Sequence, residues 1–178
     1  ERYLDGIAHL HEMGFENSIP VLDNTMELDH LLERIKGNLK VGIRVAIEQE
    51  PQSAYYTSRL GIRPSEVIKY YKEKIARKKR VQVTMLHLFV DTGIRDTLYY
   101  WGEFKKAIKI FAELKKICPS LTALNIGGGF PISNNLSFEY DYKYMVDEIV
   151  SNIKAVCSQE GIEEPDIYTE FGKYTVGE

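Results

Sequence analysis

The chain of 178 residues lacks the features of secreted and membrane proteins. Its two cysteines, Cys118 and Cys157, are too few for the disulfide framework of a small secreted domain, so we expect both to pack in the core of a cytoplasmic protein. No apolar run approaches the roughly 20 residues of a membrane-spanning helix, and no basic-then-apolar leader begins the sequence. We therefore expect no membrane partner.

Neither sign of charge dominates. Twenty-three Lys and Arg against 26 Asp and Glu give a net charge of -3, which argues against nucleic acid or an anionic membrane as a partner. The one basic cluster, residues 77–80, is expected to be a solvated helix end that favours the helix dipole.

The histidines are not spaced as metal ligands, so no metal site is predicted. His9 and His11 fall on different faces of a predicted helix, and His30 stands alone. His87 lies within a predicted strand, where a core histidine with satisfied hydrogen bonds is the ordinary explanation. The sequence also has no Gly-x-Ser-x-Gly segment and no Cys with a nearby His, so a hydrolase nucleophile has no support.

Short β-rich runs alternate with amphipathic helical patterns, which predicts an α/β fold with parallel strands. About five strands are expected, at 18–22, 41–46, 81–90, 121–126 and 166–170. About five helices are expected, at 2–13, 28–35, 66–77, 99–117 and 141–158, the second of them after a capping-box pattern at Asn24 and Glu27. Five strands cannot close a (β/α)8 barrel, which takes about 250 residues. The sequence therefore predicts an open sheet or a partial barrel of the TIM type.

Three successive glycines follow the fourth predicted strand, in the segment Asn-Ile-Gly-Gly-Gly-Phe-Pro at 125–131. Without Cβ atoms the chain can turn tightly and direct several N–H groups at one anion, as loops that bind phosphate do. The dinucleotide fingerprint is absent because Ile132 stands where it needs glycine, and no G-x-x-x-x-G-K-[ST] loop exists. From the residues alone, a phosphate-binding turn and a purely structural turn remain equally open.

A second polar segment, Thr-Glu-Phe-Gly-Lys-Tyr at 169–174, follows the last predicted strand. Strand ends converge on one mouth in a barrel, so Glu170 is expected on the same side as the glycines. Taken in isolation, Glu170 is more simply explained as a helix cap or an ion-pair partner.

Three segments in order resemble one family, the pyridoxal-phosphate decarboxylases of the ornithine, diaminopimelate and arginine type, whose barrel is like that of alanine racemase. Residues 124–131 resemble the family's glycine signature, and residues 169–174 resemble its Glu-x-Gly-Arg motif about 40 residues later. Residues 85–92, Met-Leu-His-Leu-Phe-Val-Asp-Thr, occupy the place of its Leu-His-Phe-His-x-Gly-Ser segment. The resemblance covers essentially the whole chain.

Within this group the sequence is most similar to the biosynthetic arginine decarboxylases, through residues 157–176 and 2–29. The resemblance implies a cytoplasmic, homo-oligomeric lyase that binds pyridoxal 5'-phosphate and converts the amino acid arginine to agmatine and CO2 in polyamine (spermidine) biosynthesis. Diaminopimelate or ornithine decarboxylase is the alternative within the class. A catalytically silent homologue that regulates a true decarboxylase and a plain phosphate-binding barrel module are alternatives outside it.

The resemblance also assigns residues to the cofactor. The three glycines hold the phosphate through N–H groups, Gly172 and Lys173 add to the same cradle, and Glu170 pairs with the pyridine nitrogen and keeps it protonated. Arg44 faces the cofactor, and Phe89 takes the place of a stacking histidine. The implied cofactor-binding residues are Gly127, Gly128, Gly129, Glu170, Gly172, Lys173, Phe89, Thr92 and Arg44.

Several positions depart from the family pattern. Phe89 can stack on a ring but cannot form the histidine's hydrogen bonds. Asp91 replaces a glycine and would repel a phosphate if it pointed inward. Lys173 replaces an arginine, which keeps the charge but loses the bidentate fork. Thr92 matches a serine near the phosphate.

The family's Schiff-base lysine and its carboxyl-terminal β domain have no match in this sequence. We therefore expect residues 1–178 to be an internal segment of the cofactor-binding barrel domain, with no catalytic residue of its own and no decarboxylase activity in isolation.

Overall fold

The computed structural model describes residues 2–15, 17–47, 60–132 and 139–172. Its centre is a sheet of five parallel strands in the order β1-β2-β3-β4-β5. The strands are β1 (Val21–Leu22), β2 (Leu39–Val45), β3 (Val81–Leu88), β4 (Ala123–Asn125) and β5 (Asp166–Tyr168). The helices are α1 (Arg2–Glu12), α2 (Glu27–Arg34), α3 (Pro64–Tyr70), α4 (Leu98–Ile117) and α5 (Tyr142–Glu160), and a π-helical turn, η1 (Tyr71–Ile75), extends α3. A helix between each pair of neighbouring strands confirms the predicted α/β fold.

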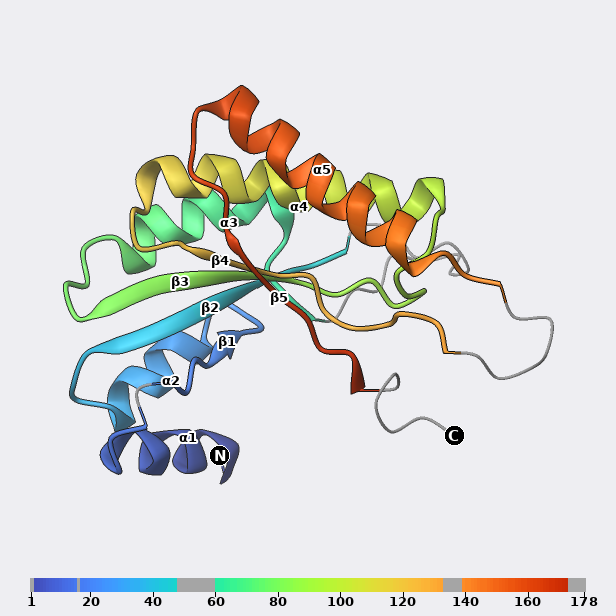
Figure 1. Cartoon of the computed structure of the whole chain (residues 1–178). Helices are drawn as coiled ribbons and strands as arrows, with labels where there is room; N and C mark the ends of the chain where they lie inside the picture. Colours follow the sequence, from blue (N-terminus) through green and yellow to red (C-terminus); the bar gives the residue numbers. More distant parts are fainter. Residues whose placement is uncertain (1, 16, 48–59, 133–138, 173–178) are drawn as a thin grey trace.

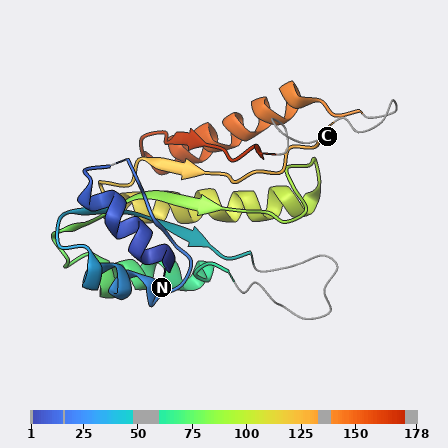
Figure 2. The same ribbon diagram turned by 90° about the horizontal axis from the view of Figure 1, so that it is seen from below.

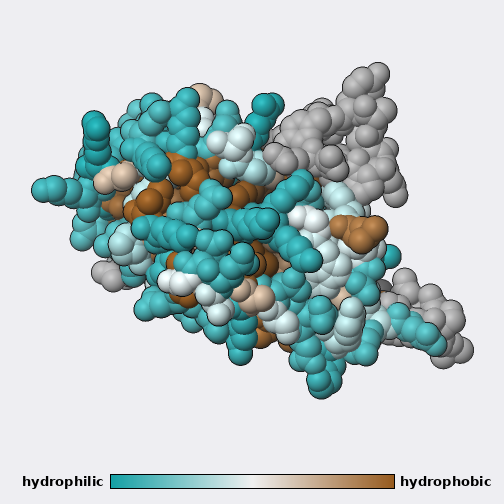
Figure 3. All heavy atoms as spheres, turned by 90° about the horizontal axis from the view of Figure 1, so that it is seen from above, coloured by the Kyte–Doolittle hydropathy of each residue, from teal (hydrophilic) through white to brown (hydrophobic). Residues whose placement is uncertain are grey.

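Helices α3, α4 and α5 lie side by side above the sheet in the view of Figure 1. Helices α2 and α1 lie below it, next to β1 and β2. The arrows of the strands point the same way, so their carboxyl ends lie at one edge of the molecule (Figure 2). Seen from the side of α4 and α5, the surface is mostly hydrophilic, with hydrophobic side chains visible between the polar ones (Figure 3). No helix among the described residues is long and apolar enough to cross a membrane.

Helix α4 contributes the largest apolar stripe to the core, as its periodicity predicts. Its members Phe104, Ile108, Phe111 and Leu114 are all at most 1% exposed. The apolar sequence positions of α5 are not all buried: Met145, Ile149 and Ile153 are buried, whereas Val146 is 46% exposed. Val146 lies about 100° around the helix from Met145, beyond the face that meets the rest of the core. Both cysteines are buried and free, as predicted.

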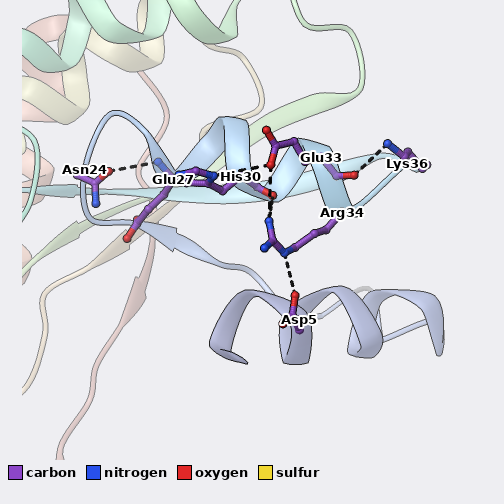
Figure 4. Close-up of polar contacts among 7 residues, drawn as sticks. All are labelled: Asp5, Asn24, Glu27, His30, Glu33, Arg34 and Lys36. Atoms are coloured by element: carbon purple, nitrogen blue, oxygen red, sulfur yellow. Dashed lines mark hydrogen bonds and ion pairs between the residues drawn. The ribbon is translucent and has the colours of Figure 1, made fainter. Parts of the chain in front are cut away.

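The capping pattern at residues 24–27 forms, although Asn24 lies two residues before the N-cap position, Met26. The Asn24 side chain accepts from the N–H groups of Met26 (2.9 Å) and Glu27 (3.2 Å), and Glu27 accepts from the N–H of Asp23 (2.6 Å). Figure 4 shows this end of α2 and the ion pair at its other end, where Arg34 Nε lies 2.9 Å from Asp5 Oδ1 of α1. The two contacts fix α2 between α1 and the sheet.

Arg80 corrects the interpretation of the basic cluster at residues 77–80. Arg77 and Lys79 are exposed as predicted, but the Arg80 guanidinium turns inward from the start of β3. It donates hydrogen bonds to the carbonyls of Leu32 (2.9 Å) and Ile35, where α2 ends. A cation at these carbonyls satisfies orphan acceptors and complements the helix dipole. Arg80 therefore caps a neighbouring helix, a contact across 48 residues that local periodicity does not reveal.

Replacing Arg80 by Ala should destabilise the fold by about 1–3 kcal/mol, because charge-assisted hydrogen bonds to part-buried carbonyls are lost. Arg77→Ala removes an equally charged but exposed side chain and should change the free energy of unfolding by less than about 0.5 kcal/mol. Urea unfolding followed by circular dichroism measures both. Equal losses in the two variants would contradict the capping role.

Candidate functional site

One row of side chains crosses the sheet at the carboxyl ends of its strands, and we call it the polar row: Arg44, His87, Asn125 and Tyr168. The strand register pairs each member with the next. Successive side chains of a strand point to opposite faces, so residues paired in register share a face. The preceding residues on three of these strands, Ile43, Leu86 and Leu124, are 0% exposed in the core. The polar row therefore occupies the face opposite these core side chains.

A register shift between β2 and β3 aligns this row. Val41 pairs with Val83, but the next residue, Gly42, pairs with Met85, so Thr84 is left over as a bulge. Without the shift, Arg44 would stand beside Leu86, whose side chain faces the core. Bulges commonly re-aim side chains next to functional sites. Here the bulge sets Arg44 beside His87.

Arg44 is held between an acid and an aromatic ring. Its guanidinium lies 3.2 Å from Asp23 Oδ1 at the end of β1. Its Cζ lies 5.7 Å from the ring centroid of Phe89, which follows β3 and is 36% exposed. Guanidinium over an aromatic face is a favourable cation–π arrangement. No sequence motif marks Asp23, and its position directly after β1 is the only local signal for it.

Glu170 meets the glycine turn, as the convergence of strand ends predicts. Its Oε1 accepts a 2.8 Å hydrogen bond from Asn125 Nδ2 and lies 3.7 Å from His87 Nε2. Its backbone N–H donates to the carbonyl of Gly127 at 2.9 Å. The side chain is 55% exposed. The hydrogen-bond partner of the carboxylate is thus a neutral carboxamide, and more than half of the side chain is exposed.

The three glycines are required by the fold around them. Gly127 and Gly129 have φ angles of 71° and 103°, in the left-handed region that favours glycine. A Cβ on Gly128 would lie 2.2 Å from the carbonyl oxygen of Glu170, so only glycine lets the two strand ends approach. The N–H of Gly127 donates to Asn125 Oδ1 at 2.8 Å. The N–H groups of Gly128 and Gly129 have no acceptor among the described residues.

The residues that follow β3 lie on the other side of the glycine turn from Glu170. Asp91 is exposed, and its Oδ1 accepts from the N–H of Thr92 at 2.8 Å, so the carboxylate is engaged with its own loop. The Thr92 hydroxyl is buried and makes no hydrogen bond within the described residues. This loop packs on the glycine turn, because the Ile94 N–H donates to the Gly129 carbonyl at 3.0 Å.

His87 is buried as predicted, at 8% exposure, but the prediction of satisfied hydrogen bonds is wrong. Neither ring nitrogen has a hydrogen-bond partner among the described residues. Burial lowers the pKa of the imidazole, and Arg44 adds to this, while Glu170 and Asp23 oppose it. A neutral imidazole therefore lies beside the Glu170 carboxylate. The described residues contain no group of three His, Cys, Asp or Glu that could hold a metal ion.

Most of the residues assigned by resemblance gather in this region. Glu170 joins the glycine turn directly, and Gly172 follows it with an N–H that donates to the Glu170 carbonyl at 2.9 Å. Arg44 and Phe89 lie together on the neighbouring strands. Lys173 lies outside the described residues. The side chain of Asn125 also belongs to the site and was not among the predicted residues, although its place on the strand before the glycines puts it on the same face as His87.

Comparison with known proteins identifies the family. Residues 5–177 match the family described as pyridoxal-dependent decarboxylase, pyridoxal binding domain. Biosynthetic arginine decarboxylase of Prochlorococcus marinus is 22% identical over 188 residues, which cover 97% of this chain and 29% of that protein. The chain thus spans less than a third of the length of this relative.

Solved structures share the fold. The biosynthetic arginine decarboxylase of Campylobacter jejuni is 25% identical with a TM-score of 0.64, over 86% of this chain and 26% of that one. Diaminopimelate decarboxylase of Helicobacter pylori, complexed with L-lysine, has a TM-score of 0.70 at 14% identity, over 88% and 40% of the two chains. These likenesses agree with a partial barrel. Since the family match extends over nearly all of its length, the chain belongs to the pyridoxal-binding domains of the pyridoxal-dependent decarboxylases.

Proposed function

We propose that this chain binds pyridoxal 5'-phosphate in a carboxy-lyase that converts arginine to agmatine and CO2. The observation that carries the proposal is the meeting of an exposed carboxylate, Glu170, with a glycine turn whose N–H groups at Gly128 and Gly129 have no acceptor among the described residues. An anion-binding turn and a carboxylate at one sheet edge suit the two ends of a cofactor that carries a phosphate and a basic ring nitrogen.

The chain's own polar groups fit that cofactor. Phosphate oxygens would accept from the N–H groups of Gly128 and Gly129 and from the buried hydroxyl of Thr92, which has no hydrogen-bond partner in the described part of the chain. The Gly127 N–H is already bound by Asn125, so its part is to shape the turn. Gly172 and Lys173 complete the cradle in the proposal.

The remaining residues would act on the ring. Bound pyridoxal phosphate supplies an electron sink for the electrons left when CO2 departs. The Glu170 carboxylate would keep the pyridine nitrogen protonated, because a neighbouring negative charge favours the charged form of a base. Phe89 presents a partly exposed aromatic ring for stacking, and Arg44 brings positive charge to the same place. No residue of this chain is proposed to do covalent chemistry.

The catalytic lysine and the second domain of the enzyme would lie outside this chain. We propose that residues 1–178 are an internal segment of the barrel domain, and that the Schiff-base lysine and the carboxyl-terminal β domain come from other parts of the parent protein. The parent would be a cytoplasmic homo-oligomer in polyamine biosynthesis. Arginine is favoured by the names of the relatives at 22% and 25% identity, and diaminopimelate or ornithine is the alternative substrate. A silent regulatory homologue is the alternative outside the class.

The substrate assignment predicts that the full-length parent, reconstituted with pyridoxal phosphate, releases CO2 from arginine faster than from ornithine, lysine or diaminopimelate. Labelled CO2 measured in parallel reactions gives the comparison. Preference for another amino acid would change the substrate alone. No release from any of the four, with cofactor bound, would favour the silent homologue.

Glu170→Ala in the full-length parent should lower the turnover number at least about 100-fold while cofactor remains bound, because the ring nitrogen loses its charged partner. Glu163→Ala removes a carboxylate that is 87% exposed and pairs with Lys115 on the helical side, and should leave turnover unchanged. Cofactor content is read from absorbance after gel filtration. Turnover of Glu170→Ala within a few-fold of wild type would remove the ring-nitrogen role.

His87 should make the fold less stable in acid. Its folded pKa lies below its ordinary value of 6.5, so the unfolded state binds the proton more readily. This stability is fully present above pH about 6.5 and is lost as the pH falls below it. Between pH 7 and 5, wild type should therefore lose more unfolding free energy than His87→Gln, whereas the exposed control His30→Gln should follow wild type. Parallel losses in wild type and His87→Gln would contradict a lowered pKa.

A further inference from the structure

A single carboxamide joins the two halves of the site. Asn125 Oδ1 accepts from the Gly127 N–H at 2.8 Å, and Asn125 Nδ2 donates to Glu170 Oε1 at 2.8 Å. Asn125 is 7% exposed, so neither contact is easily replaced by water. Asn125 and Glu170 are 45 residues apart in sequence. The Asn125 side chain thus links the carboxylate to the glycine turn.

The orientation of this carboxamide follows from chemistry. A backbone N–H can only donate, so the group facing Gly127 must be the oxygen, and the NH2 group must face Glu170. An ionised carboxylate can only accept, so the second contact is also matched. Both bonds are satisfied together in one amide orientation, and neither is satisfied in the flipped one.

This bond leaves Glu170 with one oxygen for a ligand. Oε1 is used by Asn125 and lies near His87, whereas Oε2 has no hydrogen bond or ion pair among the described residues. We propose that Asn125 is a positioning residue that turns Oε2 of Glu170 toward the ring nitrogen of the cofactor while it holds the glycine turn for the phosphate. The cofactor part of this inference rests on the proposed function, and the bridge itself does not.

The proposal requires an amide at position 125. An aspartate has the same shape and keeps the acceptor for the Gly127 N–H, but it faces Glu170 with a second carboxylate. Aspartate has no N–H to donate to Glu170, and two ionised carboxylates at this distance repel each other. Asn125→Asp therefore separates the two contacts: the one to the glycine turn remains and the one to Glu170 is lost.

Glu170→Gln restores the pair with reversed polarity. In Asn125→Asp/Glu170→Gln the new amide donates to the aspartate, while the aspartate still accepts from Gly127. We expect Asn125→Asp to lower the urea midpoint of the full-length parent, and the double variant to recover most of that loss. Asn152→Asp, which changes an Asn on the distant helix α5, serves as the matched control. Additive effects of the two site substitutions would overturn the proposal, because they would mean that the side chains do not interact.

Hydrogen exchange tests the second contact without any cofactor. The Gly127 amide should exchange at least tenfold faster in Asn125→Ala than in wild type, and at the wild-type rate in Asn125→Asp. An unchanged rate in Asn125→Ala would overturn the bridge.

Cofactor binding connects the bridge to function. Asn125→Asp should weaken the affinity for pyridoxal phosphate at least tenfold, measured by quenching of intrinsic fluorescence, whereas Asn152→Asp should not. Unchanged affinity in Asn125→Asp would overturn the positioning role. A wild-type protein that binds no pyridoxal phosphate, yet shows the coupling and the amide protection, would refute the proposed function and leave the bridge supported.

Discussion

The parallel register of β2, β3 and β4 is the constraint on which the site depends. Register alone decides that Arg44, His87 and Asn125 share a face, because neighbours one residue earlier point into the core. The bulge at Thr84 is part of this constraint, since it shifts β3 by one residue against β2. A strand slip would exchange polar and core residues at several positions together, so the fold and the site are specified by the same hydrogen bonds.

The approach of β4 and β5 places a second constraint on the sequence. The glycine turn meets the segment after β5 so closely that a Cβ on Gly128 would lie 2.2 Å from the Glu170 carbonyl oxygen. From the sequence, the glycines could form either a phosphate-binding turn or a purely structural turn. The geometry is compatible with both roles at once. Gly128 is needed to bring Glu170 near, and the same lack of a side chain leaves its N–H open to an anion.

The local sequence pattern predicted most of the strands and helices and part of the site. Periodicity located the five strands and the core stripe of α4, because burial of one helix face leaves a repeat that the sequence records. The convergence of strand ends predicted the meeting of Glu170 with the glycines. The contacts that the sequence did not reveal join distant segments: Arg80 with Leu32, and Asn125 with Glu170, are 48 and 45 residues apart. Their partners depend on packing and register, which no local window contains.

The surroundings of Phe89 and Asp91, which follow β3, explain how these two departures from the family pattern are tolerated. Asp91 would repel a phosphate if its carboxylate pointed inward, but the carboxylate accepts from the Thr92 N–H and is exposed. Phe89 cannot carry the charge of a histidine, but the Arg44 guanidinium lies 5.7 Å from the centre of its ring. Asp23 fixes this guanidinium from the other side at 3.2 Å. A charged aromatic ring such as a histidine would combine two properties, and here they come from neighbouring strands: Phe89 supplies the aromatic face and Arg44 supplies the positive charge. These departures alone are therefore weak support for a silent homologue.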